Sequence, residues 1–297
     1  MKRRDFLRNA SVGFAGAGAT AAASPFWSAQ QMKVGMRPAS RPRRSPARPK
    51  DYRKEPFRRL VILGESTVEG GPWLPNPGHD RYADALVRLI NACQEKPIEY
   101  FNKGIGANAI SPRSPGYAQS VKPSALERYK KDVIANQPDL FILAYGLNDM
   151  RAAMPIKDFR EDMATIIRDV QQACHPVTVL TTVYYMTGYR SWPPYNQGSI
   201  ELTLKYNECI RSLAEEFDCI LADVWAAEGL ADWLIHNDGV HANLVGNLVI
   251  AGRIFEAIAQ HASGLTNWAF SQVADNEWTR STMKAREQAG DPFKKTW

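Results

Sequence analysis

The chain has 297 residues, of which 44% are hydrophobic, enough for one domain with a sizeable core and for appended segments. Its formal charge of +6 is unevenly distributed: residues 1–59 hold 15 of the 37 Lys and Arg residues against three acidic ones, so they carry +12 and the remainder carries −6. Because the part with the composition of a folded domain is mildly acidic, the charge does not support a nucleic-acid partner.

The first 28 residues have the organisation of an export signal. A basic start, Lys2-Arg3-Arg4, precedes a weakly apolar stretch over residues 14–23 and small residues near Ala21 to Ser24. Paired arginines followed by x-Phe-Leu resemble the signal that directs folded proteins to the twin-arginine export machinery. We therefore expect residues 1–28 to be a leader and the mature protein to be periplasmic or secreted. We expect no integral membrane span, because no apolar run approaches the ~20 residues that a span needs.

Three further segments follow the leader. Residues 29–58 are rich in Arg and Pro, a composition that buries little, so we predict a disordered linker. Residues 59–263 have the alternating pattern of a folded domain. Residues 264–297 mix aromatic and charged side chains, and the sequence leaves open whether this C-terminal extension is a helix or a tail.

Within residues 59–263, apolar runs alternate with stretches of helical spacing. The expected strands are 60–63, 98–101, 140–144, 177–180 and 220–224, and the expected helices are 82–92, 159–173, 202–217 and 244–262. Strands separated by helices predict an α/β fold, here an α/β/α sandwich with a five-stranded parallel sheet. Functional residues of such a sheet gather at the carboxyl ends of its strands.

Ser66 follows the first expected strand, in the segment Gly64-Glu65-Ser66. A serine hydroxyl becomes a good nucleophile only when a neighbouring base removes its proton, and a serine between a strand and a helix can also be an ordinary N-cap. The segment lacks the Gly-Lys-Ser/Thr ending of a P-loop. It also has Val68 where the G-x-S-x-G elbow of α/β-hydrolases has its second glycine. Both of those sites are therefore excluded.

Two later segments supply groups that could act with Ser66. Asn148 follows the third expected strand and is either a turn residue or an amide donor to an oxyanion. Asp238 and His241 flank Gly239, and a turn there would let the carboxylate reach one imidazole nitrogen while the other serves as a base. A surface turn would explain either segment alone. Their occurrence together with Ser66 indicates an acyl-transfer site.

These segments resemble the four sequence blocks of the SGNH/GDSL hydrolase superfamily. The blocks correspond, in order, to residues 64–66, 102–107, 146–149 and 238–241, and the resemblance covers about residues 59–262. It implies a flavodoxin-like sheet and a catalytic triad in which Ser66 is the nucleophile, His241 the base and Asp238 the orienting carboxylate.

The resemblance also implies an oxyanion hole. Its donors would be the Asn148 side chain and the backbone N–H groups of Ser66 and Ala107, or of Gly106 through a shifted turn. Ala107 replaces the family's usual glycine, and it can serve without strain only if its φ is negative. Glu65 replaces the usual aspartate, and the longer side chain would alter the hydrogen bonds of the turn.

Other chemically interesting residues show less pattern. Four cysteines, which allow three pairings or free thiols, are present at positions 93, 174, 209 and 219. Neither they nor the histidines have metal-ligand spacing, and we expect no metal and no cofactor. Aromatic residues could line a cleft around the site, although we expect most of them to pack onto the domain instead. The candidates for substrate contact are Trp73, Tyr184, Trp192 and Trp233.

The function implied by the resemblance is that of an exported serine esterase. It would hydrolyse small acyl esters, such as acetyl esters, of carbohydrate or lipid through an acyl-enzyme intermediate. Two alternatives remain open: an O-acyltransferase with the same Ser-His-Asp site, and a non-catalytic module that binds glycans or the cell envelope.

Overall fold

The computed structural model describes residues 49–274, 280–281, 284–285 and 288. The chain divides into two units, residues 1–47 and 48–297, and all described residues belong to the second. The predicted leader and residues 29–48 of the predicted linker therefore lie outside the described residues.

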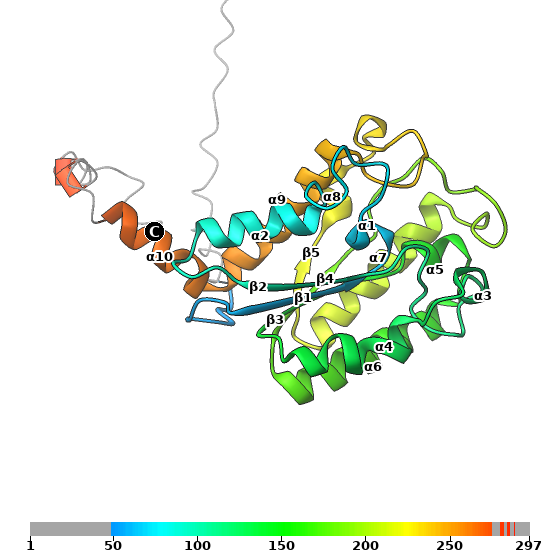
Figure 1. The fold of residues 1–297 in the computed structure, drawn as a ribbon, viewed down its shortest axis with the longest axis horizontal. Helices are drawn as coiled ribbons and strands as arrows, with labels where there is room; N and C mark the ends of the chain where they lie inside the picture. The colour runs from blue at the N-terminus through cyan, green and yellow to red at the C-terminus, as the bar shows by residue number, and fades with distance from the viewer. Residues whose placement is uncertain (1–48, 275–279, 282–283, 286–287, 289–297) are drawn as a thin grey trace, which may run out of the picture. The chain divides into compact units, whose positions relative to one another are not determined.

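A five-stranded parallel sheet forms the centre of the described unit (Figure 1). Its strands are β1 (Arg59–Gly64), β2 (Glu99–Gly104), β3 (Leu140–Ala144), β4 (Val177–Thr181) and β5 (Ile220–Ala222). The spatial order is β2-β1-β3-β4-β5, which is the flavodoxin-like order, and the predicted fold class is confirmed. The order reverses between β1 and β3, and ligands of such sheets bind beyond the carboxyl ends of the strands at this point.

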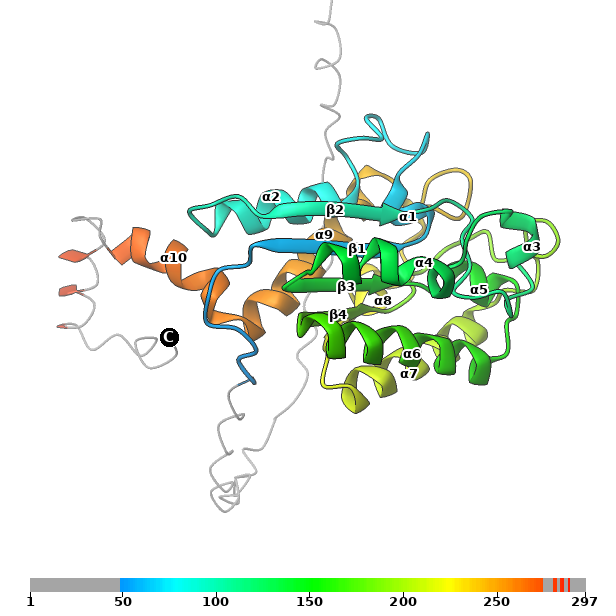
Figure 2. The same ribbon diagram turned by 60° about the horizontal axis from the view of Figure 1, so that its bottom comes forward.

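Helices cover both faces of the sheet, as Figures 1 and 2 show. One face carries α2 (Tyr82–Ala92), α8 (Val224–Glu228) and α9 (Leu244–His261), and the other carries α4 (Ala125–Asp132), α6 (Ile156–Cys174) and α7 (Ile200–Glu216). The shorter elements are α1 (Ser66–Glu69), α3 (Tyr117–Ser120), η1 (Ile134–Asn136), α5 (Leu147–Arg151) and η2 (Asp232–Leu234), and α10 (Ser263–Ala274) is the last continuous helix. Because both faces are covered, every residue of β3 and β4 is buried and apolar runs mark these strands in the sequence.

Helix α4 is absent from the sequence prediction. Its residues read Ala-Leu-Glu-Arg-Tyr-Lys-Lys-Asp, and one of its buried side chains is Arg128, so no apolar stripe reveals it. The guanidinium of Arg128 donates to the backbone oxygens of Gly64 and Lys103 at the ends of β1 and β2. A capping box of Ser124 and Glu127 begins the helix, and this Ser-x-x-Glu spacing was the available sequence signal.

The linker prediction is wrong for residues 49–58, which pack on the domain. The backbone N–H of Tyr52 donates to His261 O at 2.7 Å, and Phe57 is buried in the core. The Asp139 carboxylate, at the start of β3, accepts the backbone N–H groups of Arg58 and Arg59. Aromatic anchors and a shared carboxylate thus hold the segment at the amino ends of the strands despite its charge.

Three remaining expectations concern the described residues. All four cysteines lie among them, and each is a free thiol. The first part of the C-terminal extension is helical, since it belongs to α10. Among the described residues, every helix is too short or too polar to cross a membrane.

Candidate active site

Ser66 begins α1 directly after the carboxyl end of β1. Its Oγ lies 2.9 Å from Nε2 of His241, a residue 175 positions later in the chain. The last residue of β1, Gly64, makes the close approach of α1 possible, because a Cβ there would lie 2.3 Å from a methyl of Val68. The structure therefore brings the predicted nucleophile and base into hydrogen-bond contact.

Asp238 completes a three-residue chain of hydrogen bonds. Its Oδ2 lies 2.8 Å from Nδ1 of His241, while its Oδ1 accepts the backbone N–H groups of Val240 and His241 at 2.8 and 2.9 Å. Gly239 adopts a φ of +76°, which other residues rarely adopt, and its carbonyl oxygen accepts the N–H of Gly188 at 2.6 Å. The turn that carries the carboxylate is thus fixed from both sides.

The protonation states in this chain suit general-base chemistry. Burial opposes ionisation of Asp238, but hydrogen bonds from the backbone of His241 and Val240 and from the imidazole lower its pKa to about 2. Burial lowers the pKa of His241 below its usual 6.5, although Asp238 opposes this shift. At neutral pH the carboxylate is therefore ionised, and the imidazole is neutral and able to accept a proton.

Asn148 lies in α5, which follows β3 as α1 follows β1. Its side-chain Nδ2 donates to Asn108 O at 3.1 Å, which orients the amide and leaves one N–H of the group for another acceptor. The Glu65 carboxylate accepts the backbone N–H groups of Leu147 and Asn148 at 3.2 and 3.0 Å. The structure thus couples the turn before Ser66 to the helix that carries Asn148.

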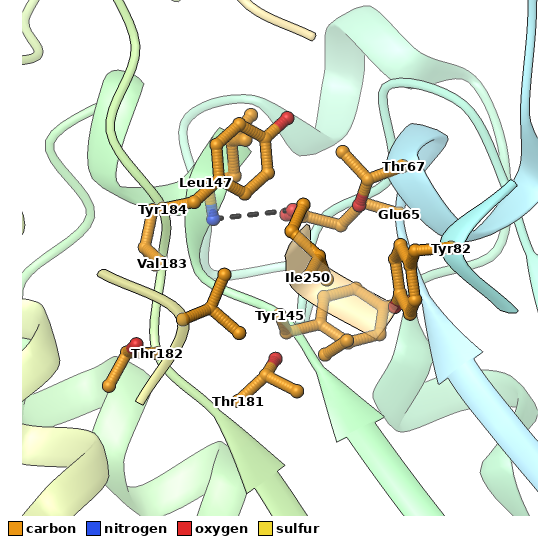
Figure 3. Close-up of a pocket in the computed structure, with 12 residues that line it drawn as sticks. Glu65, Thr67, Tyr82, Tyr145, Leu147, Thr181, Thr182, Val183, Tyr184 and Ile250 are labelled. Atoms are coloured by element: carbon orange, nitrogen blue, oxygen red, sulfur yellow. Dashed lines mark hydrogen bonds between the residues drawn. The ribbon is translucent and has the colours of Figure 1, made fainter. Parts of the chain in front are cut away.

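A small cavity of about 30 Å³ is lined by Glu65 and Leu147, among other residues. Figure 3 shows Glu65 directed toward Leu147, with Tyr82, Thr181 and Tyr184 among the residues that line the cavity. The volume is enough for about one water molecule. Desolvation is the largest cause that raises the pKa of Glu65 well above its usual value, and repulsion from Asp149 is the second.

Ala107 adopts a φ of +53°, so the substitution of the family's glycine does place alanine in the left-handed region. Its carbonyl oxygen accepts from the Tyr195 hydroxyl at 3.3 Å. Two anchors fix the surrounding loop: Ile105 N–H donates to Gly64 O at 3.1 Å, and Ile110 N–H donates to the Asp149 carboxylate at 3.2 Å. These two contacts hold the loop near the carboxyl end of β1.

The four aromatic candidates lie in different environments. Trp73 stacks on the His241 imidazole with ring centroids 3.5 Å apart, so this face of its indole is covered. Tyr184 is buried and its hydroxyl donates to Val240 O, which leaves it little surface for a substrate. Trp192 and Trp233 are 57% and 68% exposed.

The contacts of Trp73 and Glu65 were not predicted from the sequence. A glutamate beside the nucleophile indicated only altered hydrogen bonds, and no spacing pattern connects Trp73 with a histidine 168 positions later.

A metal role has no structural support in the part of the chain that is described, because no group of three or more His, Cys, Asp or Glu side chains converges there.

Comparison with known proteins shows the family to which the chain is similar. The model of the "GDSL-like Lipase/Acylhydrolase family" matches residues 62–249, which include Ser66, Asn148, Asp238 and His241. An acetylxylan esterase from Geobacillus stearothermophilus is 22% identical over 217 residues, which are 65% of this chain and 90% of that protein.

Solved structures share the fold. A lipase/acylhydrolase from Enterococcus faecalis has a TM-score of 0.54 at 20% identity, over 68% of this chain and 95% of that one. The crystal structure of an acetylxylan esterase from Geobacillus stearothermophilus has a TM-score of 0.53 at 20% identity, over 69% and 96% of the two chains. At this identity, the likeness demonstrates a common architecture.

Proposed function

The chain belongs to the GDSL-like lipase/acylhydrolase family of serine ester hydrolases, and we propose that it is an exported esterase that removes small acyl groups, such as acetyl, from carbohydrate. The observation that carries the proposed chemistry is the chain of contacts from Ser66 Oγ to His241 Nε2 and from His241 Nδ1 to Asp238, at 2.9 and 2.8 Å. Nucleophile, base and orienting carboxylate are the three groups that acyl transfer requires.

In the proposed acylation step, His241 Nε2 takes the proton of the Ser66 hydroxyl while Oγ attacks the ester carbonyl carbon. The carbonyl π electrons move to oxygen. Asn148 Nδ2 and the backbone N–H groups of Ser66 and of Ala107, or of Gly106 in its place, stabilise this oxyanion. Collapse of the tetrahedral intermediate breaks the bond to the alcohol oxygen, which receives the proton from His241. Water, deprotonated by the same imidazole, then attacks the acyl carbon. The bond to Ser66 Oγ breaks as Oγ regains the proton from His241, and the acid is released.

The substrate assignment has two supports. One relative acts, by its name, on acetylxylan, which is an acetylated polysaccharide. The exposed indoles of Trp192 and Trp233 are suited to stacking on sugar faces. A lipid ester is the competing substrate class, and a panel of substrates separates the two.

The test begins with a fluorophosphonate probe on the mature protein, with the adduct located by mass spectrometry. We expect the adduct on Ser66 and its loss in the His241→Ala variant. Acetylated xylo-oligosaccharides and p-nitrophenyl esters of two, four and eight carbons are then compared, with Ser66→Ala as the control. Preference for acetyl and carbohydrate supports the proposal, whereas preference for long chains contradicts the carbohydrate assignment. Absence of both adduct and turnover in a folded protein contradicts the catalytic assignment and favours a binding module.

The same products distinguish hydrolysis from acyl transfer. With excess acceptor alcohol, a hydrolase releases mainly acetate, whereas an O-acyltransferase forms mainly the new ester. Export is tested separately by replacing Arg3 and Arg4 with lysine in the full chain. We expect the unmodified protein in the periplasm or medium and the double variant retained in the cytoplasm.

A further inference from the structure

The indole of Trp73 lies flat on the imidazole of His241. The ring centroids are 3.5 Å apart and the two planes differ by 5°, so the rings overlap face to face with little lateral offset. Neutral aromatic pairs generally prefer offset or edge-to-face arrangements, because both ring faces carry negative potential. A cation is attracted to the same face, and indole is the best of the aromatic partners for it. This geometry therefore suits imidazolium better than imidazole.

We propose that Trp73 is a positioning residue that stabilises the imidazolium of His241 formed when the Ser66 proton moves to Nε2. The proposal rests on the proposed function, because that proton transfer belongs to the acylation step. An interaction that is stronger in the charged transition state than in the ground state raises kcat rather than substrate affinity. The stack also restricts rotation of the ring and so keeps Nε2 directed at Ser66, 2.9 Å away.

The local backbone holds Trp73 in this position. A Cβ on Gly71 would lie 2.2 Å from ring atom Cζ3 of Trp73, so the indole folds tightly over a residue that has no side chain. Leu74 is buried, and its N–H donates to Gly71 O at 3.0 Å. Arg81, at the end of the loop, donates to Glu69 O at 3.2 Å and closes the loop. These contacts hold the indole over the imidazole.

Other charged and titratable groups also act on His241, and they come from elements other than the Trp73 loop. Asp238, from the same turn as His241, favours the protonated ring, whereas Arg151 of α5 and the neighbouring His236 disfavour it. Replacing the indole of Trp73 with another apolar side chain leaves the charges of these three groups in place. Burial lowers the pKa of His241, so loss of cover alone would raise it, whereas loss of the indole face lowers it. The direction of the change therefore separates the two effects.

The direct test is an NMR titration of the His241 imidazole in the mature protein, with the signal assigned by its loss in His241→Gln. Trp73→Leu retains apolar cover but removes the π face. We expect it to lower the pKa of His241 by about 0.4 to 1.5, the range that a cation–π contact supports. Trp73→Phe retains a π face and should keep the value nearer to wild type. Trp268→Leu, in α10 beyond the other end of the sheet, is the matched control and should change nothing.

A second variant moves the ring without removing it. Gly71→Ala introduces a Cβ where the indole lies, and we expect it to lower the pKa of His241 in the same direction as Trp73→Leu. With p-nitrophenyl acetate, both variants should lose about 3- to 30-fold in kcat with little change in KM. An unchanged or raised pKa of His241 in a folded Trp73→Leu protein overturns the proposal. Because the titration needs no turnover, this outcome is distinguishable from failure of the proposed esterase function.

Discussion

Oε1 of Glu65 lies 3.0 Å from the backbone nitrogen of Asn148, so the residue before the proposed nucleophile holds the helix that carries the proposed amide donor. Asp149, the next residue of that helix, extends the connection by accepting the N–H of Ile110 in the loop that follows Ala107. Two buried carboxyl groups thus connect the segments that would supply all three oxyanion donors. Backbone N–H groups that these carboxyl groups accept, and not side-chain packing alone, set the relative positions of the three segments.

Removal of the Glu65 acceptor should affect both stability and activity. Glu65→Ala leaves the buried N–H groups of Leu147 and Asn148 without their partner, at about 1–3 kcal/mol each. We expect the free energy of unfolding to fall by about 2–5 kcal/mol in urea denaturation, together with a loss of kcat. Glu65→Asp restores the family's usual acid, retains an acceptor and should lose less of both. Equal stability of Glu65→Ala and wild type would show that water replaces the carboxylate without penalty.

The pH dependence of catalysis should follow His241. Because burial lowers the pKa of His241, the acid limb of kcat/KM for p-nitrophenyl acetate should lie below pH 6.5. Asp238→Asn removes the group that favours the protonated ring, so the acid limb should move further down in pH. It should also reduce kcat about 10⁴-fold, because an amide cannot stabilise the imidazolium or fix the required tautomer. A limb that moves upward would contradict the assigned role of Asp238.

Ala107→Gly tests whether alanine, at a position where the family usually has glycine, destabilises the protein. A left-handed conformation costs an L-residue about 1–2 kcal/mol, while glycine adds about 0.5–1 kcal/mol of chain entropy to the unfolded state. We expect the free energy of unfolding to rise by at most about 1.5 kcal/mol and kcat to stay within about threefold of wild type. The matched variant Ala107→Val, with a β-branched side chain at the same φ, should be destabilised. A large loss of activity in Ala107→Gly would mean that the methyl group shapes the site.

Glu228 should make the protein less stable in alkaline solution. It is 5% exposed, and neither of its carboxyl oxygens has a hydrogen-bond partner among the described residues. Burial raises its pKa from 4.5 to about 8. The native state therefore keeps a proton that the unfolded chain releases, so the contribution to stability is fully present below about pH 4.5 and is lost as the pH rises through about 8.

We expect Glu228→Gln to remove this dependence. Between pH 5 and 9, wild type should lose on the order of a few kcal/mol of unfolding free energy relative to the variant. Urea denaturation at the two pH values measures the difference, and Glu95→Gln, at an exposed position, is the control. If the free energies of unfolding of wild type and Glu228→Gln change equally with pH, water or a moving group solvates the carboxylate.

Much of the architecture could be predicted from the sequence, because strands that are buried on both faces appear in it as apolar runs. The run at 140–144 coincides with β3, and the helix predicted over 82–92 coincides with α2. Helix α4 could not be found in this way, since it buries Arg128 and satisfies that charge with backbone oxygens that only the folded sheet brings together.

The site was predicted to the extent that its groups lie within short sequence blocks. Asp238 and His241 meet through a turn whose glycine is visible in the sequence. The stack of Trp73 on His241 depends instead on the path of the loop after Gly71, which no periodicity encodes. Tyr184 illustrates the converse, because an aromatic residue near the site in sequence can be part of the core.

The attachment of residues 49–58 at the amino ends of the strands has a consequence for access. Asp139 holds Arg58 and Arg59 at the amino ends of the strands, whereas α1 and α5 begin at their carboxyl ends (Figure 1). Residues 49–58 therefore lie on the side of the sheet away from Ser66. A substrate as large as a polymer could therefore approach Ser66 without meeting residues 49–58.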